Sequence, residues 1–199
     1  MKFKTSIKEV PQKLIKNNDV NKIKKLPLIR EASKMLNEAE IVAFPTETVY
    51  GLGADARNSA AVKKIFQAKG RPQDNPLIVH ISSLEQFQAI SRGKIETDIK
   101  NLLNNFWPGP LTIVLPKSEI IPERTTAGLK TVGIRMPAHP VARALIEETA
   151  APLAAPSANK SGLPSPTRAG HVLDDLSGKI PLIIDGGVCA VGVESTVIT

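Results

Sequence analysis

The sequence has few of the residues that build cross-linked, membrane-spanning or base-stacking proteins. It contains one cysteine, Cys189, which excludes an internal disulfide and suits a reducing cytoplasm. No apolar run approaches the roughly 18 residues that a membrane helix needs, and the N-terminus lacks the apolar stretch of a secretory signal. One Trp and one Tyr argue against a stacking platform for nucleic-acid bases. We therefore expect a soluble cytoplasmic protein without membrane contact.

Positive charge is concentrated at one end of the chain. Residues 1–30 carry nine Lys or Arg and two acids, whereas residues 31–199 carry 17 of each sign. We therefore expect a basic N-terminal segment over 1–30 and one domain over 31–199, which is long enough to bury a substantial core. Two interpretations of the basic segment stay open. It could contact RNA through phosphates, or it could be a solvated and partly disordered tail.

Helical and strand patterns alternate along the rest of the chain. The spacing of apolar residues predicts helices over 28–39, 60–68, 84–90, 97–106, 139–149 and 167–176. It predicts strands over 41–44, 77–81, 111–115, 131–135, 153–155, 182–184 and 193–198. Several of these strands are apolar on both faces, which favours an α/β or α+β domain around one twisted, mixed sheet flanked by helices.

Polar residues gather where the predicted strands end, and α/β folds bind their ligands at such ends. The stretch AKGRPQDNPLIVH, residues 68–80, places two cations in a proline-fixed loop between a helix and a buried strand. A solvated turn and a polyanion site both fit this stretch taken alone. The other strand-end groups are PTETVYGLG (45–53), Arg135, PSAN (156–159), DGG (185–187) and GVEST (192–196). Each has an ordinary structural explanation, but their convergence favours a functional site.

These groups are hydroxyls, amides and cations rather than covalent nucleophiles. Cys189 has no basic neighbour in the sequence, and Ser157 lacks a G-x-S-x-G elbow. The three histidines are too scattered to give a zinc-binding spacing, and neither a P-loop nor G-x-G-x-x-G occurs. Positioning and charge stabilisation supply most of the catalysis in phosphoryl or nucleotidyl transfer. Lys69 and Arg71 would counter phosphate charge in such a reaction.

Six motifs together resemble the threonylcarbamoyl-AMP synthase family, the YrdC-like domain: FPTETVYGLG, KGRP-x-x-NPLIVHI, FWPGPLT, GIRMP, APSAN-x-SG-x-PSPT and VESTV. The resemblance covers residues 31–199 and implies a twisted α/β sheet around a large concave cavity. It implies a nucleotidyltransferase that converts L-threonine, bicarbonate and ATP into L-threonylcarbamoyladenylate and diphosphate. That product serves N6-threonylcarbamoylation of adenosine 37 in tRNA, so the tRNA-modification machinery is the implied partner.

The resemblance also implies roles for individual residues. Lys69 and Arg71 would be catalytic, acting on the phosphates. The implied ATP-binding residues are Lys69, Arg71, Asn75, Thr131, Asn159 and Thr167. The implied threonine-binding residues are Thr48, Tyr50, His80, Arg135, Ser157 and Ser195. Mg²⁺ would bridge ATP oxygens rather than occupy a protein cage.

The family domain continues beyond the point that corresponds to Thr199, so the resemblance implies a chain cut short before a C-terminal segment. Two rival functions stay open. One is the YrdC-like domain of hydrogenase-maturation carbamoyltransferases, whose substrate is carbamoyl phosphate. The other is a non-catalytic double-stranded RNA binder, which would show steeply salt-dependent binding without ATP turnover.

Overall fold

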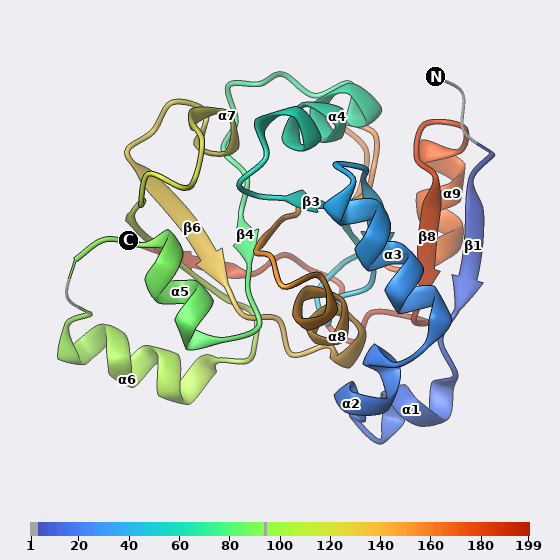
Figure 1. Ribbon diagram of the computed structural model, residues 1–199, viewed down its shortest axis with the longest axis horizontal. Helices are drawn as coiled ribbons and strands as arrows, with labels where there is room; N and C mark the ends of the chain where they lie inside the picture. Colours follow the sequence, from blue (N-terminus) through green and yellow to red (C-terminus); the bar gives the residue numbers. More distant parts are fainter. Residues whose placement is uncertain (1–3, 94) are drawn as a thin grey trace.

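Nine strands form one mixed sheet in the part of the chain that the computed structural model describes, residues 4–93 and 95–199 (Figure 1). The strand order is β1-β8-β2-β3-β7-β4-β6-β5-β9. Four neighbouring pairs are parallel (β1 with β8, β8 with β2, β4 with β6, β5 with β9) and the other four are antiparallel. The prediction of an α/β fold built on a mixed sheet is confirmed.

The strands are β1 (Ser6–Glu9), β2 (Val42–Phe44), β3 (Gly51–Asp55), β4 (Val79–His80), β5 (Leu111–Pro116), β6 (Thr131–Arg135), β7 (Leu153–Ala154), β8 (Leu182–Asp185) and β9 (Thr196–Ile198). The helices are α1 (Gln12–Lys16), α2 (Val20–Lys24), α3 (Pro27–Asn37), α4 (Ser59–Lys69), α5 (Leu84–Ile90), α6 (Thr97–Phe106), α7 (Glu123–Thr126), α8 (Pro140–Thr149) and α9 (Ala169–Leu176).

The two faces of the sheet are covered by different sets of helices. Successive side chains of a strand point to opposite faces, so Val42 and Phe44 enter one core while Ala43 enters the other. The first core also takes residues from α2, α3 and α8, and the second from α4, α5 and α9. Both cores are mainly aliphatic, as the composition predicts.

Local sequence signals set the limits of α4, the helix that leads into the cation-bearing loop. The Asn58 side chain accepts hydrogen bonds from the Ala60 and Ala61 amides, 3.0 and 3.2 Å away, and so caps the first turn. The helix ends at Gly70, whose left-handed backbone (φ 60°, ψ 34°) favours glycine. Both limits were expected from the sequence, and they fix where Arg71 leaves the helix.

The basic N-terminal residues belong to the fold. Strand β1 lies parallel to β8 at one edge of the sheet, with Ser6 opposite Leu182. Farther along, Val10, Ile23 and Ile29 are fully buried in the core that also contains α8. The interpretation of this segment as a partly disordered tail is therefore wrong for residues 4–30. Among the described residues no helix is both long and apolar enough to cross a bilayer.

Candidate functional site

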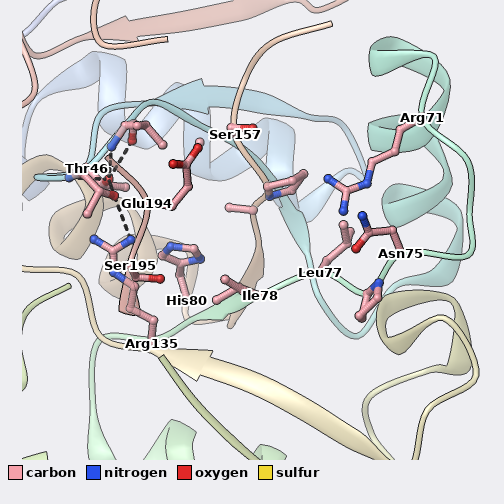
Figure 2. A pocket seen from close by; sticks show the side chains of 16 residues that line it. Thr46, Arg71, Asn75, Leu77, Ile78, His80, Arg135, Ser157, Glu194 and Ser195 are labelled. Carbon is pink, nitrogen blue, oxygen red and sulfur yellow. Dashed lines mark hydrogen bonds between the residues drawn. The ribbon is translucent and has the colours of Figure 1, made fainter. Parts of the chain in front are cut away.

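A cavity of about 250 Å³ opens at the ends of the central strands (Figure 2). It is lined by Thr46, Thr48, Val49, Gly51, Arg71, Asn75, Pro76, Leu77, Ile78, His80, Arg135, Ala155, Pro156, Ser157, Glu194 and Ser195. Figure 2 shows two ends, one around Arg135 and His80 and the other around Arg71 and Asn75. The cavity therefore offers one cation at each end.

Arg135 is held rigidly at the first end. Its Nη1 donates to Thr48 Oγ1 at 2.9 Å and its Nε to the Gly109 carbonyl at 3.2 Å. The Nη2 atom lies 2.5 Å from Glu47 Oε1 as an ion pair, but the two groups are not aligned for a hydrogen bond. Arg135 is only 4% exposed. A guanidinium fixed in this way, with donors still available, is suited to bind a carboxylate through its planar fork.

His80 lies beside Arg135 because β4 and β6 pair in parallel with these two residues opposite each other. Burial, together with the neighbouring Arg135 charge, lowers the pKa of His80 to about 3. The imidazole is therefore neutral at neutral pH, and its buried Nδ1 has no hydrogen-bond partner within the described chain. A ligand hydroxyl or amine would satisfy this nitrogen.

Gly53 of β3 makes room for the aromatic ring that supports His80, whereas Gly51 is at ordinary contact distance from that ring. The Phe44 ring packs edge-on against the His80 ring, with centroids 6.4 Å apart. A Cβ atom on Gly53 would lie 2.6 Å from Phe44 Cε1, and one on Gly51 would lie 3.5 Å from Phe44 Cζ. The GLG sequence at residues 51–53 thus belongs to a strand that accommodates Phe44.

Arg71 and Asn75 form the second end of the cavity. Both lie in the 70–76 loop between α4 and β4, and Figure 2 shows their side chains converging. Burial lowers the pKa of the Arg71 guanidinium, with Asp74 opposing that shift, and its buried Nε has no hydrogen-bond partner among the described residues. Phosphate oxygens would supply the acceptors that this guanidinium lacks.

Helix α7 anchors this loop from outside the cavity. Arg124 on α7 donates from Nε to Gln73 Oε1 at 3.2 Å and from Nη1 to Ser59 Oγ at 2.8 Å. The Leu77 amide donates to the Thr125 carbonyl at 2.9 Å. The sequence did not predict α7, which is one short turn.

We expect Arg124→Ala to loosen the loop, because the substitution removes the hydrogen bond that ties Gln73 to α7. At about 1 kcal/mol for a net hydrogen bond, amide hydrogen exchange over residues 71–76 should become roughly fivefold faster. Arg30→Ala, at an exposed position on α3, is the matched control. Equal exchange rates in the two variants would show that α7 does not hold the loop.

Lys69 is buried behind the loop rather than lining the cavity. Its ammonium donates to the Asn159 carbonyl at 2.6 Å, to Asn159 Oδ1 at 3.1 Å and to the Ser157 carbonyl. An ammonium has three N–H donors, so these acceptors use all of them. Burial and the nearby Arg71 lower the pKa of Lys69 to about 8, although Asp175 opposes this. Lys69 thus fixes the backbone that presents Ser157.

The cavity brings together seven of the residues predicted for the site, and the other five lie elsewhere. Those that line it are Thr48, Arg71, Asn75, His80, Arg135, Ser157 and Ser195. Lys69 and Asn159 lie behind it, as does Tyr50, which is fully buried and donates from its hydroxyl to the Gly187 carbonyl at 2.7 Å. Thr167 lies on a neighbouring loop, where its carbonyl accepts from the Cys189 amide. Thr131 begins β6, four residues and roughly 13 Å from Arg135 at about 3.3 Å per residue.

Two acids of the site were missed by the sequence analysis. Glu47 pairs with Arg135, and Glu194 lines the cavity. Both stand beside residues that were predicted, Thr48 and Ser195. An acid next to a predicted ligand-binding hydroxyl, near one end of a strand, was the available signal. Within the described residues no group of three or more His, Cys, Asp or Glu side chains is placed to hold a metal ion.

The structure is thus an α/β protein whose mixed sheet carries a cavity with a cation at either end. The family model Sua5_yciO_yrdC, described as telomere recombination, matches residues 34–199. The chain therefore belongs to the Sua5/YciO/YrdC family.

Relatives in this family carry a specific name. The threonylcarbamoyl-AMP synthase of Pyrococcus abyssi is 59% identical over 170 residues, which are 85% of this chain and 50% of the relative. The Bacillus subtilis protein of the same name is 58% identical over 174 residues, 87% of this chain and 50% of that protein. The crystal structure of P. abyssi Sua5 complexed with L-threonine superposes with a TM-score of 0.85 at 50% identity, covering 100% of this chain and 54% of that one. The chain thus spans about half the length of these relatives.

Proposed function

We propose that this chain is the catalytic part of an L-threonylcarbamoyladenylate synthase. The observation that carries the proposal is the two-ended cavity, which has the rigid Arg135 at one end and Arg71 with Asn75 at the other. A carboxylate of threonine fits the first end and the phosphates of ATP fit the second. The family and the names of its relatives support this choice over the hydrogenase-maturation carbamoyltransferase.

In the proposed reaction, the threonine ammonium group and bicarbonate form a carbamate, with loss of one water and one proton. A carbamate oxygen then attacks the α-phosphorus of ATP, and the bond to the departing diphosphate breaks. Threonine is held by Arg135, Thr48, His80 and Ser195, and Ser157 lies between the two ends. The protein supplies positioning and charge, so no covalent nucleophile is required.

Lys69 and Asn159 act indirectly in this proposal. The Lys69 ammonium donates its hydrogen bonds to the carbonyl groups of residues 157 and 159. It therefore positions Ser157 instead of contacting phosphate. Tyr50 plays a similar part for the loop at Gly187. Thr131 and Thr167 would reach ATP only through a part of the nucleotide that extends outside the cavity.

Mg²⁺ is expected to arrive with ATP. The described residues offer no cluster of metal ligands, so the fold fits a cation bound mainly by phosphate oxygens and water. When bound, the cation would offset phosphate charge. The protein's own contribution to that charge balance comes from Arg71.

We also infer that the product passes to the tRNA-modification machinery in the cytoplasm, and that basic residues near the N-terminus provide an RNA contact. Two of these lysines form ion pairs within the protein: Lys8 pairs with Glu31, and Lys22 pairs with Asp19 at 2.9 Å. The contact would therefore depend on the remaining cations, such as Lys13 and Lys16 on α1.

The function is tested by threonine-dependent release of diphosphate from ATP in the presence of bicarbonate and Mg²⁺. Release that requires both threonine and bicarbonate is the expected result. ATP hydrolysis that is indifferent to threonine would overturn the proposal. Salt-sensitive RNA binding without any turnover would favour the RNA-binding rival.

We expect Arg71→Ala to raise the apparent KM for ATP about 10- to 100-fold, because a charge-assisted contact to phosphate is lost (about 1.5–3 kcal/mol). Threonine affinity should stay unchanged, since Arg71 lies at the other end of the cavity. Arg71→Lys keeps the charge but not the planar fork, so its apparent KM for ATP should lie between those of the wild type and Arg71→Ala. Unchanged diphosphate release in Arg71→Ala would contradict the assigned role.

A further inference from the structure

Glu194 is the one acid among the described residues that line the cavity, where Arg71 and Arg135 are the cations. Figure 2 shows its carboxylate at the end that holds His80 and Arg135, away from Arg71. A lone carboxylate in a cationic cavity would weaken the binding of an anion. It would strengthen the binding of a ligand that carries a positive group near a negative one.

One backbone and one side-chain hydrogen bond tie the segment around Glu194 to residues beside Arg135. The Gly192 amide donates to the Thr48 carbonyl at 3.0 Å, and the Thr48 hydroxyl is the group that accepts from Arg135. On the other side, Ser195 Oγ lies 2.7 Å from Thr112 Oγ1, and Thr112 pairs with Arg135 across β5 and β6. The segment that carries Glu194 is therefore tied to the residues that surround the guanidinium.

The Glu194 carboxylate is also oriented. Ser165 Oγ donates to Glu194 Oε1, and among the described residues no hydrogen bond is found to Oε2. His80, which lies beside Arg135 at this end, is neutral and so cannot balance a ligand cation by charge. Glu47 is already paired with Arg135. Glu194 is thus the side chain at this end that can form an ion pair with a positively charged group of a ligand.

We propose that Glu194 binds the α-ammonium group of the amino-acid substrate and so determines specificity for α-amino acids. Arg135 takes the carboxylate and Glu194 the ammonium, so the two side chains recognise the zwitterion as a pair. Carboxylic acids that lack an amine would leave Glu194 without a counter-charge and would bind poorly. This inference rests on the proposed function, because it names how the same site selects its amino acid.

The test compares binding of L-threonine with binding of 3-hydroxybutanoate, which replaces the amino group by hydrogen. In the Glu194→Gln variant, calorimetry should give a threonine Kd about tenfold higher, the effect of a charge-assisted hydrogen bond in a partly exposed site. The Kd of 3-hydroxybutanoate should stay unchanged or fall, because a carboxylate that repels it is gone. Glu194→Asp should restore part of the preference. Glu38→Gln, at the exposed position that follows the last residue of α3, should behave as the wild type.

The outcomes separate this inference from the proposed function. Wild-type protein that binds neither threonine nor ATP would overturn the proposed function. Wild-type protein that binds threonine, with Glu194→Gln binding it equally well, would overturn the role of Glu194 alone. Equal weakening of threonine and 3-hydroxybutanoate, or weaker ATP binding with threonine unchanged, would likewise overturn it.

Discussion

Replacing Arg135 with alanine is expected to weaken L-threonine binding about 100- to 1,000-fold. Truncating one partner of a buried, hydrogen-bonded charge pair costs about 2–5 kcal/mol. Here the loss has two parts: the carboxylate of threonine loses its fork, and Glu47 is left as a buried acid without its counter-charge. Arg135→Lys should recover little of the affinity, because a point charge cannot replace the planar fork.

A double variant separates binding from folding in this prediction. Glu47→Gln removes the stranded charge, so Arg135→Ala combined with Glu47→Gln should unfold at a higher denaturant midpoint than Arg135→Ala alone. Threonine binding should stay lost in both. Calorimetry with threonine and urea unfolding measure the two effects. Threonine affinity that returns in the double variant would show that Arg135 serves the fold and not the ligand.

Replacing Lys69 with methionine is expected to lower the free energy of unfolding by roughly 2–4 kcal/mol, because hydrogen bonds from a charged donor are lost and buried acceptors are left unpaired. The acceptors are the carbonyl groups of Ser157 and Asn159 and the Asn159 side chain. The rate of diphosphate release should also fall, because the Ser157 carbonyl loses the hydrogen bond that positions this residue.

The pH dependence of this effect has a defined sign. Burial holds the Lys69 pKa at about 8, below the ordinary value of 10.5. Between these pH values the unfolded chain binds more protons at Lys69 than the folded chain does, so stability from this group rises with pH. The stability of the wild type relative to Lys69→Met should therefore increase from about pH 8 to pH 10.5 and stay flat below pH 8. A difference that shrinks over this window would contradict the burial of the ammonium.

Elements with strong local signals could be predicted from the sequence to within a residue or two. Helix α6 and strand β6 have the expected bounds, and α4 begins and ends at its predicted caps. Strand β3 was missed because its glycines resemble a turn, and it is defined by pairing with β2 and β7. Strand β1 was missed because its partner, β8, lies about 175 residues away in the sequence.

The site residues also divide into those with a local sequence signal and those whose contacts are distant in the sequence. His80 and Arg135 were candidates because each lies at the end of a buried strand, and their threonine-binding role was implied by the family resemblance; parallel pairing places them side by side. The surroundings of Lys69 could not be read from its neighbours, because its acceptors are 88 and 90 residues away. A lysine two residues before an arginine suggests phosphate binding. Only the folded chain shows that Lys69 already donates hydrogen bonds to Ser157 and Asn159.

The contacts that build the cavity join distant parts of the chain, and this affects how the protein must fold. Lys69 reaches Asn159 across 90 residues, Arg135 reaches Thr48 across 87, and Thr112 reaches Ser195 across 83. Each contact closes a long loop, whose entropy is lost before the contact forms. During synthesis no binding site can exist until Ser195 has left the ribosome. Substrates that bind the completed cavity would then favour the folded chain by mass action, so threonine and ATP would act as folding ligands as well as reactants.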